Sequence, residues 1–133
     1  MVPRPEEQPG MARILLVEDD VLVRLLIADE LRMAGLTVIE AASADEALVY
    51  LGAGGHADLV FTDIEMPGTM NGLEMARHLR AWTPALPVIL TSGKFMSQNI
   101  GGLGLFIAKP YSVEQAVQLV LEQLGAQQPN GGE

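Results

Sequence analysis

The chain has 133 residues, which is enough for one domain with a hydrophobic core and too few for two ordinary ones. Its formal net charge of −9 argues against non-specific nucleic-acid binding, which depends on clustered Lys and Arg. No apolar run approaches the roughly 20 residues that span a bilayer, and there is no cysteine, so we expect no membrane insertion and a cytoplasmic location.

Short aliphatic runs alternate with longer segments of helical periodicity, a pattern that predicts a parallel βα repeat. The first half is expected to form a strand at 14–17, a helix at about 21–34 ended by Gly35, a strand at 36–40 and a helix from 44 to the glycines at 54 and 55. Ser43 and Glu46 have the spacing of a capping box at the start of that second helix.

The second half continues the alternation. It is expected to form a strand at 59–62 running into Asp63, a helix at about 72–81, strands at 88–90 and 105–108, and a last helix at 113–124 that begins with a capping box of Ser112 and Gln115. Residues 1–11 and 125–133 are expected to be disordered tails around one domain at 12–124. Five strands and about five helices predict an α/β fold: a doubly wound five-stranded parallel sheet with helices on both faces.

In such a sheet the functional site lies outside the carboxyl ends of the strands. The polar residues expected there are Glu18, Asp19, Asp63, Thr91, Ser92 and Lys109. Converging carboxylates would raise one another's pKa values unless a cation neutralised them, and hard oxygen ligands favour Mg²⁺, or Mn²⁺ as a substitute. A metal and the Lys109 ammonium facing one carboxylate suit the binding of a phosphoryl group. Asp20 alone is better explained as a helix cap.

Four segments resemble the signature blocks of response-regulator receiver domains of bacterial two-component systems, the CheY-like superfamily. They are Ile14 to Asp20, Phe61 to Gly68, Leu86 to Gly93 and the pair Lys109-Pro110, in the family's order. The resemblance covers about Ala12 to Leu124 and implies a single-domain receiver with strand order 2-1-3-4-5. It also implies a phosphorylation-dependent switch or phosphorelay receiver rather than an enzyme.

The resemblance assigns roles residue by residue. Asp63 would be the phosphoacceptor, taking a phosphoryl group from a histidine kinase or a histidine phosphotransfer protein. Asp19, Asp63 and the backbone carbonyl of Glu65 would hold Mg²⁺ directly, and Glu18 would act through water. Lys109 would pair with Asp63 or a phosphoryl oxygen.

The resemblance also implies a switch. The hydroxyl would come from Ser92, with Thr91 as the alternative, and would be drawn toward the phosphoryl group while Phe106 turns inward. The glycine-rich stretch between Gly93 and Gly104 leaves room for only a short or irregular fourth helix. Such shortened segments resemble receivers attached to, or working beside, hybrid histidine kinases.

Three other functions compete with this interpretation. A phosphatase of the haloacid-dehalogenase type needs a second Asp two residues after its nucleophile, where this chain has Glu65. A flavodoxin-like cofactor module needs a phosphate-binding loop after the first strand, where the run Glu18-Asp19-Asp20 would repel phosphate. A receiver-fold binding module that acts without phosphorylation remains the main alternative.

Overall fold

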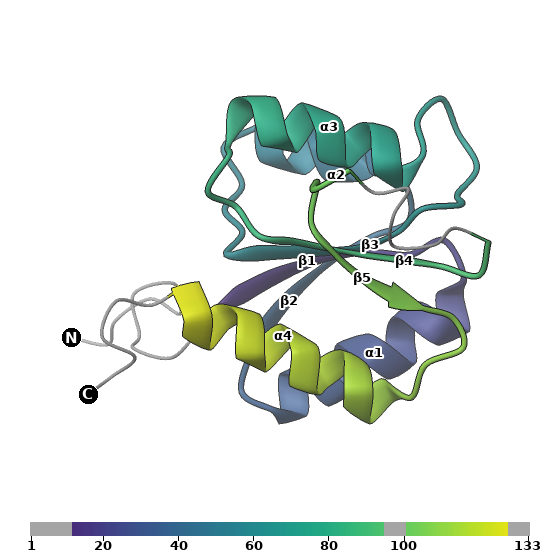
Figure 1. Ribbon diagram of the computed structural model, residues 1–133, viewed down its shortest axis with the longest axis vertical. Helices are drawn as coiled ribbons and strands as arrows, with labels where there is room; N and C mark the ends of the chain where they lie inside the picture. The colour runs from purple at the N-terminus through teal and green to yellow at the C-terminus, as the bar shows by residue number, and fades with distance from the viewer. Residues whose placement is uncertain (1–11, 95–100, 128–133) are drawn as a thin grey trace.

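The chain forms an open parallel sheet whose strands are those expected from the aliphatic runs (Figure 1). The computed structural model describes residues 12–94 and 101–127. The strands are β1 (Arg13–Val17), β2 (Thr37–Ala41), β3 (Leu59–Asp63), β4 (Val88–Ser92) and β5 (Leu105–Ala108). All neighbouring pairs are parallel and their order is β2-β1-β3-β4-β5. The predicted fold class and strand order are confirmed.

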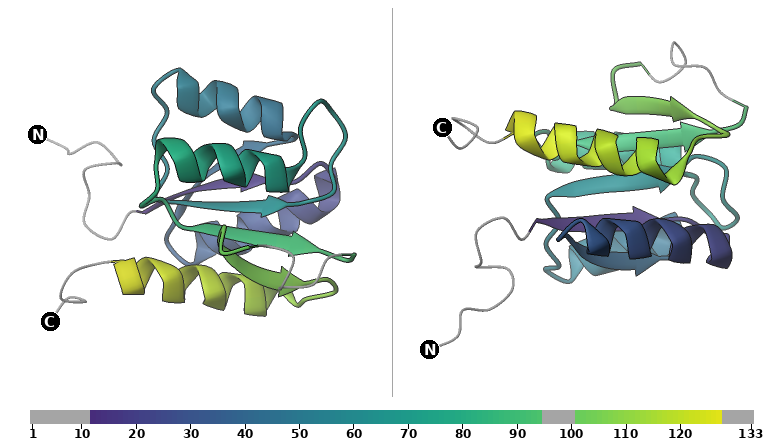
Figure 2. Two further views of the ribbon diagram at one scale, coloured as in Figure 1. Left: turned by 45° about the horizontal axis from the view of Figure 1, so that its top comes forward. Right: turned by 90° about the horizontal axis from the view of Figure 1, so that it is seen from below.

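Helices cover both faces of the sheet. They are α1 (Val21–Met33), α2 (Ala44–Gly52), α3 (Gly72–Trp82) and α4 (Val113–Gln127). Figures 1 and 2 show α2 and α3 on one face and α1 and α4 on the other. None of the helices in the described part of the chain has the length and apolar character needed to cross a membrane.

Helix starts follow the capping signals of the sequence. The Ser43 side chain accepts from the backbone N–H of Glu46 at 3.1 Å, but the Glu46 carboxylate accepts from Ala42 N rather than from Ser43 N. At α4 the predicted box is complete, because Ser112 and Gln115 each accept from the other's backbone N–H at 3.0 Å. These contacts satisfy N–H groups that have no partner inside the helix.

The last helix is longer than expected. It runs to Gln127 rather than ending at Leu124, so residues 125–127 belong to the helix and not to a tail. A glycine inside an exposed helix costs only about 1 kcal/mol relative to alanine, which explains why Gly125 does not end it. The structure leaves the expectation of disorder for 1–11 and 128–133 outside the described residues.

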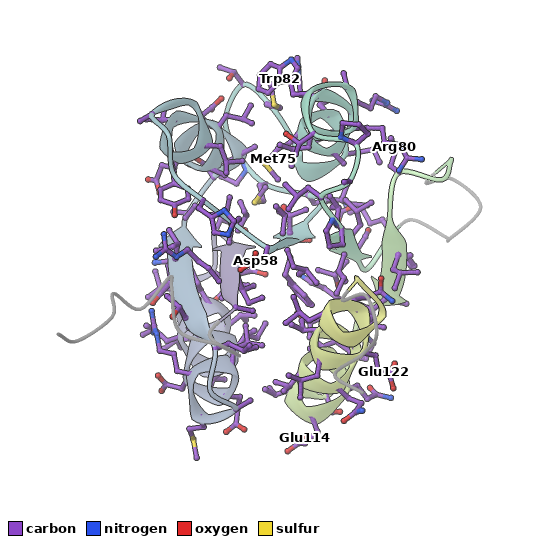
Figure 3. The ribbon with its side chains drawn as sticks, turned by 90° about the vertical axis from the view of Figure 1, so that its left-hand side faces the viewer. Asp58, Met75, Arg80, Trp82, Glu114 and Glu122 are labelled. Atoms are coloured by element: carbon purple, nitrogen blue, oxygen red, sulfur yellow. The ribbon has the colours of Figure 1, made fainter. Side chains whose placement is uncertain are left out.

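Each face of the sheet has its own hydrophobic cluster, because successive strand residues point to opposite faces. Leu15, Val60 and Leu90 pack on the α2 and α3 side, and Ile14, Phe61 and Ile89 pack on the α1 and α4 side. In Figure 3, Met75 points from α3 toward the sheet, whereas Glu114 and Glu122 point away from it on α4. The two clusters hold the strands in register and thereby fix the positions of the residues at their carboxyl ends.

Candidate functional site

Strand register brings the predicted site residues to one edge of the molecule. Val17 lies beside Thr62, Asp63 beside Thr91, and Ser92 beside Ala108. Glu18 and Lys109 directly follow their strands, and the backbone N–H of Lys109 extends the ladder to Ser92 O at 2.9 Å. This edge lies away from the start of β1 and the end of α4 (Figure 1).

Three carboxylates converge there. Glu18, Asp19 and Asp63 each place an oxygen within 4.8 Å of the others. Glu18 and Asp63 are buried and Asp19 is exposed. Asp63 Oδ1 is buried and has no hydrogen-bond partner among the described residues. Such an oxygen-only set, open to solvent at Asp19, has the ligand chemistry that a hard divalent cation prefers.

Burial disfavours the charged forms of the two inner carboxylates. It raises the pKa of Glu18 to about 7, against the backbone N–H of Asp20, and the Asp63 charge adds to the rise. Burial also raises the pKa of Asp63, and the hydrogen bond from Lys109 opposes that rise. A cation in the pocket would relieve both carboxylates, since an opposite charge favours the ionised form.

Lys109 supplies positive charge to the pocket. Its Nζ lies 3.0 Å from Asp63 Oδ2 and 3.9 Å from Glu18 Oε1. Burial works against the ammonium, but the hydrogen bond and charge of Asp63 outweigh it and raise the pKa of Lys109. The Lys109–Pro110 peptide bond is cis. The contact between Lys109 Nζ and Asp63 Oδ2 pairs the ammonium with the carboxylate.

The loop after β1 is held from two sides. Asp20 is the N-cap of α1 and accepts from Leu22 N and Val23 N, which confirms the capping interpretation. Arg24 donates from Nη1 to Glu18 O at 2.8 Å, and its Nε contacts Glu40 Oε1 at 3.1 Å. Arg24 thus fixes the backbone of the residue whose carboxylate enters the acidic cluster.

Thr91 and Ser92 have different surroundings, because adjacent strand residues face opposite sides of the sheet. Ser92 Oγ donates to Glu65 Oε2 at 2.5 Å and accepts from Lys94 N at 2.9 Å. Thr91 is buried beside the Tyr111 hydroxyl on the other face, without forming a hydrogen bond of standard geometry. The assignment of the switch hydroxyl to Ser92 rather than Thr91 stays a prediction, as does the role of the Glu65 carbonyl.

Phe106 and Tyr111 lie on opposite faces. Phe106 stands beside Leu90 in the sheet and packs on the α2 and α3 side, so it shares a face with Ser92. Tyr111 packs on the α1 and α4 side, with its ring 6.1 Å from that of Phe61 in an edge contact. Burial, with the Glu18 and Asp63 charges, raises the pKa of Tyr111, while Thr91 opposes the rise.

Comparison with known proteins agrees with this geometry. The family described as "Response regulator receiver domain" matches residues 14–121. The chain belongs to this family. The receiver domain is 41% identical over 110 residues to the C4-dicarboxylate transport transcriptional regulatory protein DctD of Rhizobium meliloti, covering 79% of this chain and 24% of DctD.

Two further similarities bear on this receiver domain. The sensor kinase CckA of Brucella abortus is 36% identical over 132 residues, covering 95% of this chain and 14% of CckA. The structure of the response regulator TrrA of Thermotoga maritima, in complex with Mg²⁺ and BeF, is 30% identical with a TM-score of 0.76, covering 86% of this chain and 99% of that one. The receiver domain thus spans a small part of both sequence relatives.

Some residues of the receiver site were missed by sequence analysis. Arg24 lies on the side of α1 that faces β2, where it contacts Glu40. Nothing in the sequence indicates that its side chain also reaches the backbone of Glu18. Tyr111 follows Lys109-Pro110 and is the aromatic nearest to the signature pair along the chain. The side-chain contact between Glu65 and Ser92 has no sequence signal, since it joins the loop after β3 to the last residue of β4.

The segment between β4 and β5 was expected to hold a short or irregular helix. Residues 95–100 lie outside the described residues, so that expectation stays a prediction for most of the segment. The described parts, 93–94 and 101–104, form bends and turns. Gly101 and Gly102 have φ values of 65° and 77°, a backbone conformation that other residues rarely adopt.

Proposed function

We propose that this receiver domain is a phosphorylation-dependent switch or phosphorelay receiver of a two-component system, with Asp63 as the phosphoacceptor. The main support for this proposal is the way in which the two oxygens of the Asp63 carboxylate are held. Oδ2 is held by Lys109 at 3.0 Å, and the buried Oδ1 faces no hydrogen-bond donor among the described residues. Such an oriented carboxylate is an activated nucleophile, because it needs no deprotonation by a base once it is ionised.

The proposed reaction moves one phosphoryl group. A carboxylate oxygen of Asp63 attacks the phosphorus of a phosphohistidine in a histidine kinase or phosphotransfer protein. The P–N bond breaks, the imidazole nitrogen takes the electron pair and later a proton, and an acyl phosphate remains on Asp63. Lys109 then faces both the carboxylate and a phosphoryl oxygen, where its charge stabilises the transferred group.

We propose Mg²⁺ as the cofactor, since the donor set is made only of oxygens. Asp19, Asp63 and the Glu65 carbonyl would hold the ion, and Glu18 would bind one of its waters. The ion would neutralise charge on the phosphoryl oxygens during transfer. The orphaned Asp63 Oδ1 and the clustered carboxylates fit this assignment.

We further propose that the chain is not an enzyme for an external substrate. It would assist only its own phosphorylation and its own dephosphorylation, which would be slow. Its partners would be proteins rather than nucleic acid, consistent with a net charge of −9. The cytoplasm is the proposed place of action, because the chain has no cysteine for the disulfides of oxidising compartments.

The test is intact mass after incubation with acetyl phosphate or phosphoramidate, with Mg²⁺ and with a chelator. We expect a gain of one phosphoryl group that needs Mg²⁺ and is lost in Asp63→Asn. Asp29→Asn, on the exposed face of α1, is the matched control and should react as the wild type does. If neither small donors nor a set of phosphohistidine proteins labelled the wild type, the domain would instead be a binding module that acts without phosphorylation.

A further inference from the structure

The contact between Glu65 and Ser92 joins the loop after β3 to the end of β4. Ser92 is 1% exposed, and its Oγ donates to Glu65 Oε2 at 2.5 Å. Ser92 Oγ also accepts a hydrogen bond from the backbone N–H of Lys94 at 2.9 Å. An O–H to carboxylate distance of this length marks a charge-assisted hydrogen bond, roughly twice as strong as a neutral one.

A serine hydroxyl carries a single hydrogen, so it donates to one strong acceptor at a time. While Ser92 donates to Glu65, it cannot donate to a phosphoryl group on Asp63. Glu65 therefore competes with the phosphoryl group for the hydroxyl on which the proposed switch depends.

We propose that Glu65 is a restraining residue: its carboxylate holds the Ser92 hydroxyl in the unphosphorylated arrangement, and phosphorylation of Asp63 must displace it. This inference rests on the proposed function and concerns the same site. Its consequence is a switch biased toward the resting state, since every ligand of Asp63 must overcome the Glu65–Ser92 bond before Ser92 can respond.

Electrostatics supports the release step. The Glu65 charge reaches the acceptor, because it contributes to raising the pKa values of both Asp63 and Lys109. A phosphoryl group on Asp63 adds negative charge near the Glu65 carboxylate and would repel it. The Glu65 carboxylate that accepts the Ser92 hydrogen bond at rest is thus the group that a phosphoryl group on Asp63 would repel.

The restraint also reaches the sheet. Ser92 is two residues beyond Leu90 on the same face of β4, and Phe106 stands opposite Leu90 on β5. Freeing Ser92 would let it move toward Asp63 and open space on the face where Phe106 packs. Glu65 would in this way oppose the inward turn of Phe106 without touching it.

A double-mutant cycle tests this inference. The variants are Glu65→Ala, Ser92→Ala and the pair, and the measurement is the affinity for beryllofluoride in the presence of Mg²⁺, followed by NMR. We expect Glu65→Ala to tighten binding when Ser92 is present, by about tenfold more than in the Ser92→Ala background, because a hydrogen bond to a charged group is lost only in the first case. Glu65→Gln should give a smaller gain, since its amide oxygen is a neutral acceptor.

Affinity for Mg²⁺ alone is measured for each variant to remove any effect on the metal. In the ligand-free protein, Glu65→Ala should also move the Phe106 ring resonances part of the way toward their positions in the beryllofluoride complex. Equal effects of Glu65→Ala in both backgrounds would mean that Glu65 acts through charge alone and would overturn the restraint. If neither the wild type nor Glu65→Ala bound beryllofluoride, the proposed function itself would fall.

Discussion

Ionisation of Glu18 should make the metal-free protein less stable as the pH rises. Burial raises the pKa of this carboxyl to about 7 from an ordinary value of 4.5. Between these two values the folded protein keeps a proton that the unfolded chain has lost. The folded state therefore binds more protons in this window, and the free energy of unfolding falls from about pH 4.5 until it levels off above about pH 7.

The size of the effect follows from the pKa difference. The interval from 4.5 to about 7 is 2.5 pH units, and at about 1.4 kcal/mol for each unit it sets a ceiling of about 3–4 kcal/mol. Solvent reaches the pocket at Asp19, which is exposed, and screening reduces the expected loss to about 1–2 kcal/mol. The raised pKa of Asp63 acts in the same direction.

Urea unfolding at pH 5, 6, 7 and 8, in chelator and in excess Mg²⁺, measures this loss. Glu18→Gln should reduce the slope in chelator, because an amide does not ionise yet can accept from Asp20 N as Glu18 does at 3.1 Å. Glu30→Gln, an exposed carboxylate on α1, should leave the slope unchanged. Mg²⁺ should restore stability above pH 7 through binding to the folded state alone. The reasoning is refuted if stability in chelator rises between pH 5 and 7, or if Glu18→Gln keeps the full slope.

Three further changes test the parts that position the site. In Gly72→Ala the new Cβ would lie 2.0 Å from Asp63 O, so we expect the free energy of unfolding in urea to fall by about 1–3 kcal/mol and acetyl phosphate to label the variant more slowly. The control is Gly125→Ala, whose Cβ would meet open space and which should be neutral or stabilising. Arg24→Met keeps the aliphatic stem but loses the bond to Glu18 O, and should weaken Mg²⁺ binding about tenfold by calorimetry; unchanged affinity would contradict a positioning role. Leu26→Ser, in an apolar groove of about 580 Å³ beside Lys109, should slow transfer from a phosphohistidine protein several-fold and leave labelling by acetyl phosphate unchanged.

Much of the fold could be predicted because the spacing of apolar residues along the chain indicates where strands and helices lie. The aliphatic runs gave β5 at the expected residues and placed β1 and β3 to within one residue. Two strands depart further from the predicted bounds, for a physical reason. β2 is shifted by one residue to Thr37–Ala41, and β4 continues through Thr91 and Ser92, because ladder pairing with neighbouring strands extends or shifts a strand beyond its aliphatic run.

The acidic cluster could be predicted for a related reason. In a parallel sheet, the residues that follow the strands must meet at one edge, whatever the loops do. Glu18, Asp63 and Lys109 are each fixed by a strand end, and the structure brings them together. Contacts made by long side chains across loops have no such constraint. The reach of Arg24 to Glu18 O and the bond from Ser92 to Glu65 depend on rotamers and loop conformation, which neither periodicity nor spacing encodes.

Binding of Mg²⁺ to the acidic pocket should be coupled to the release of protons from Glu18. Burial raises the pKa of Glu18 to about 7, so part of the metal-free protein should carry a proton on Glu18 at neutral pH. A divalent cation favours its ionised form, so binding of Mg²⁺ should release a fraction of a proton per ion. Calorimetric titration with Mg²⁺ in two buffers of different ionisation enthalpy at pH 7 measures this number, which should fall toward zero at pH 9 and in Glu18→Gln. Equal heats in both buffers at pH 7 would show that Glu18 is already ionised or lies outside the field of the ion.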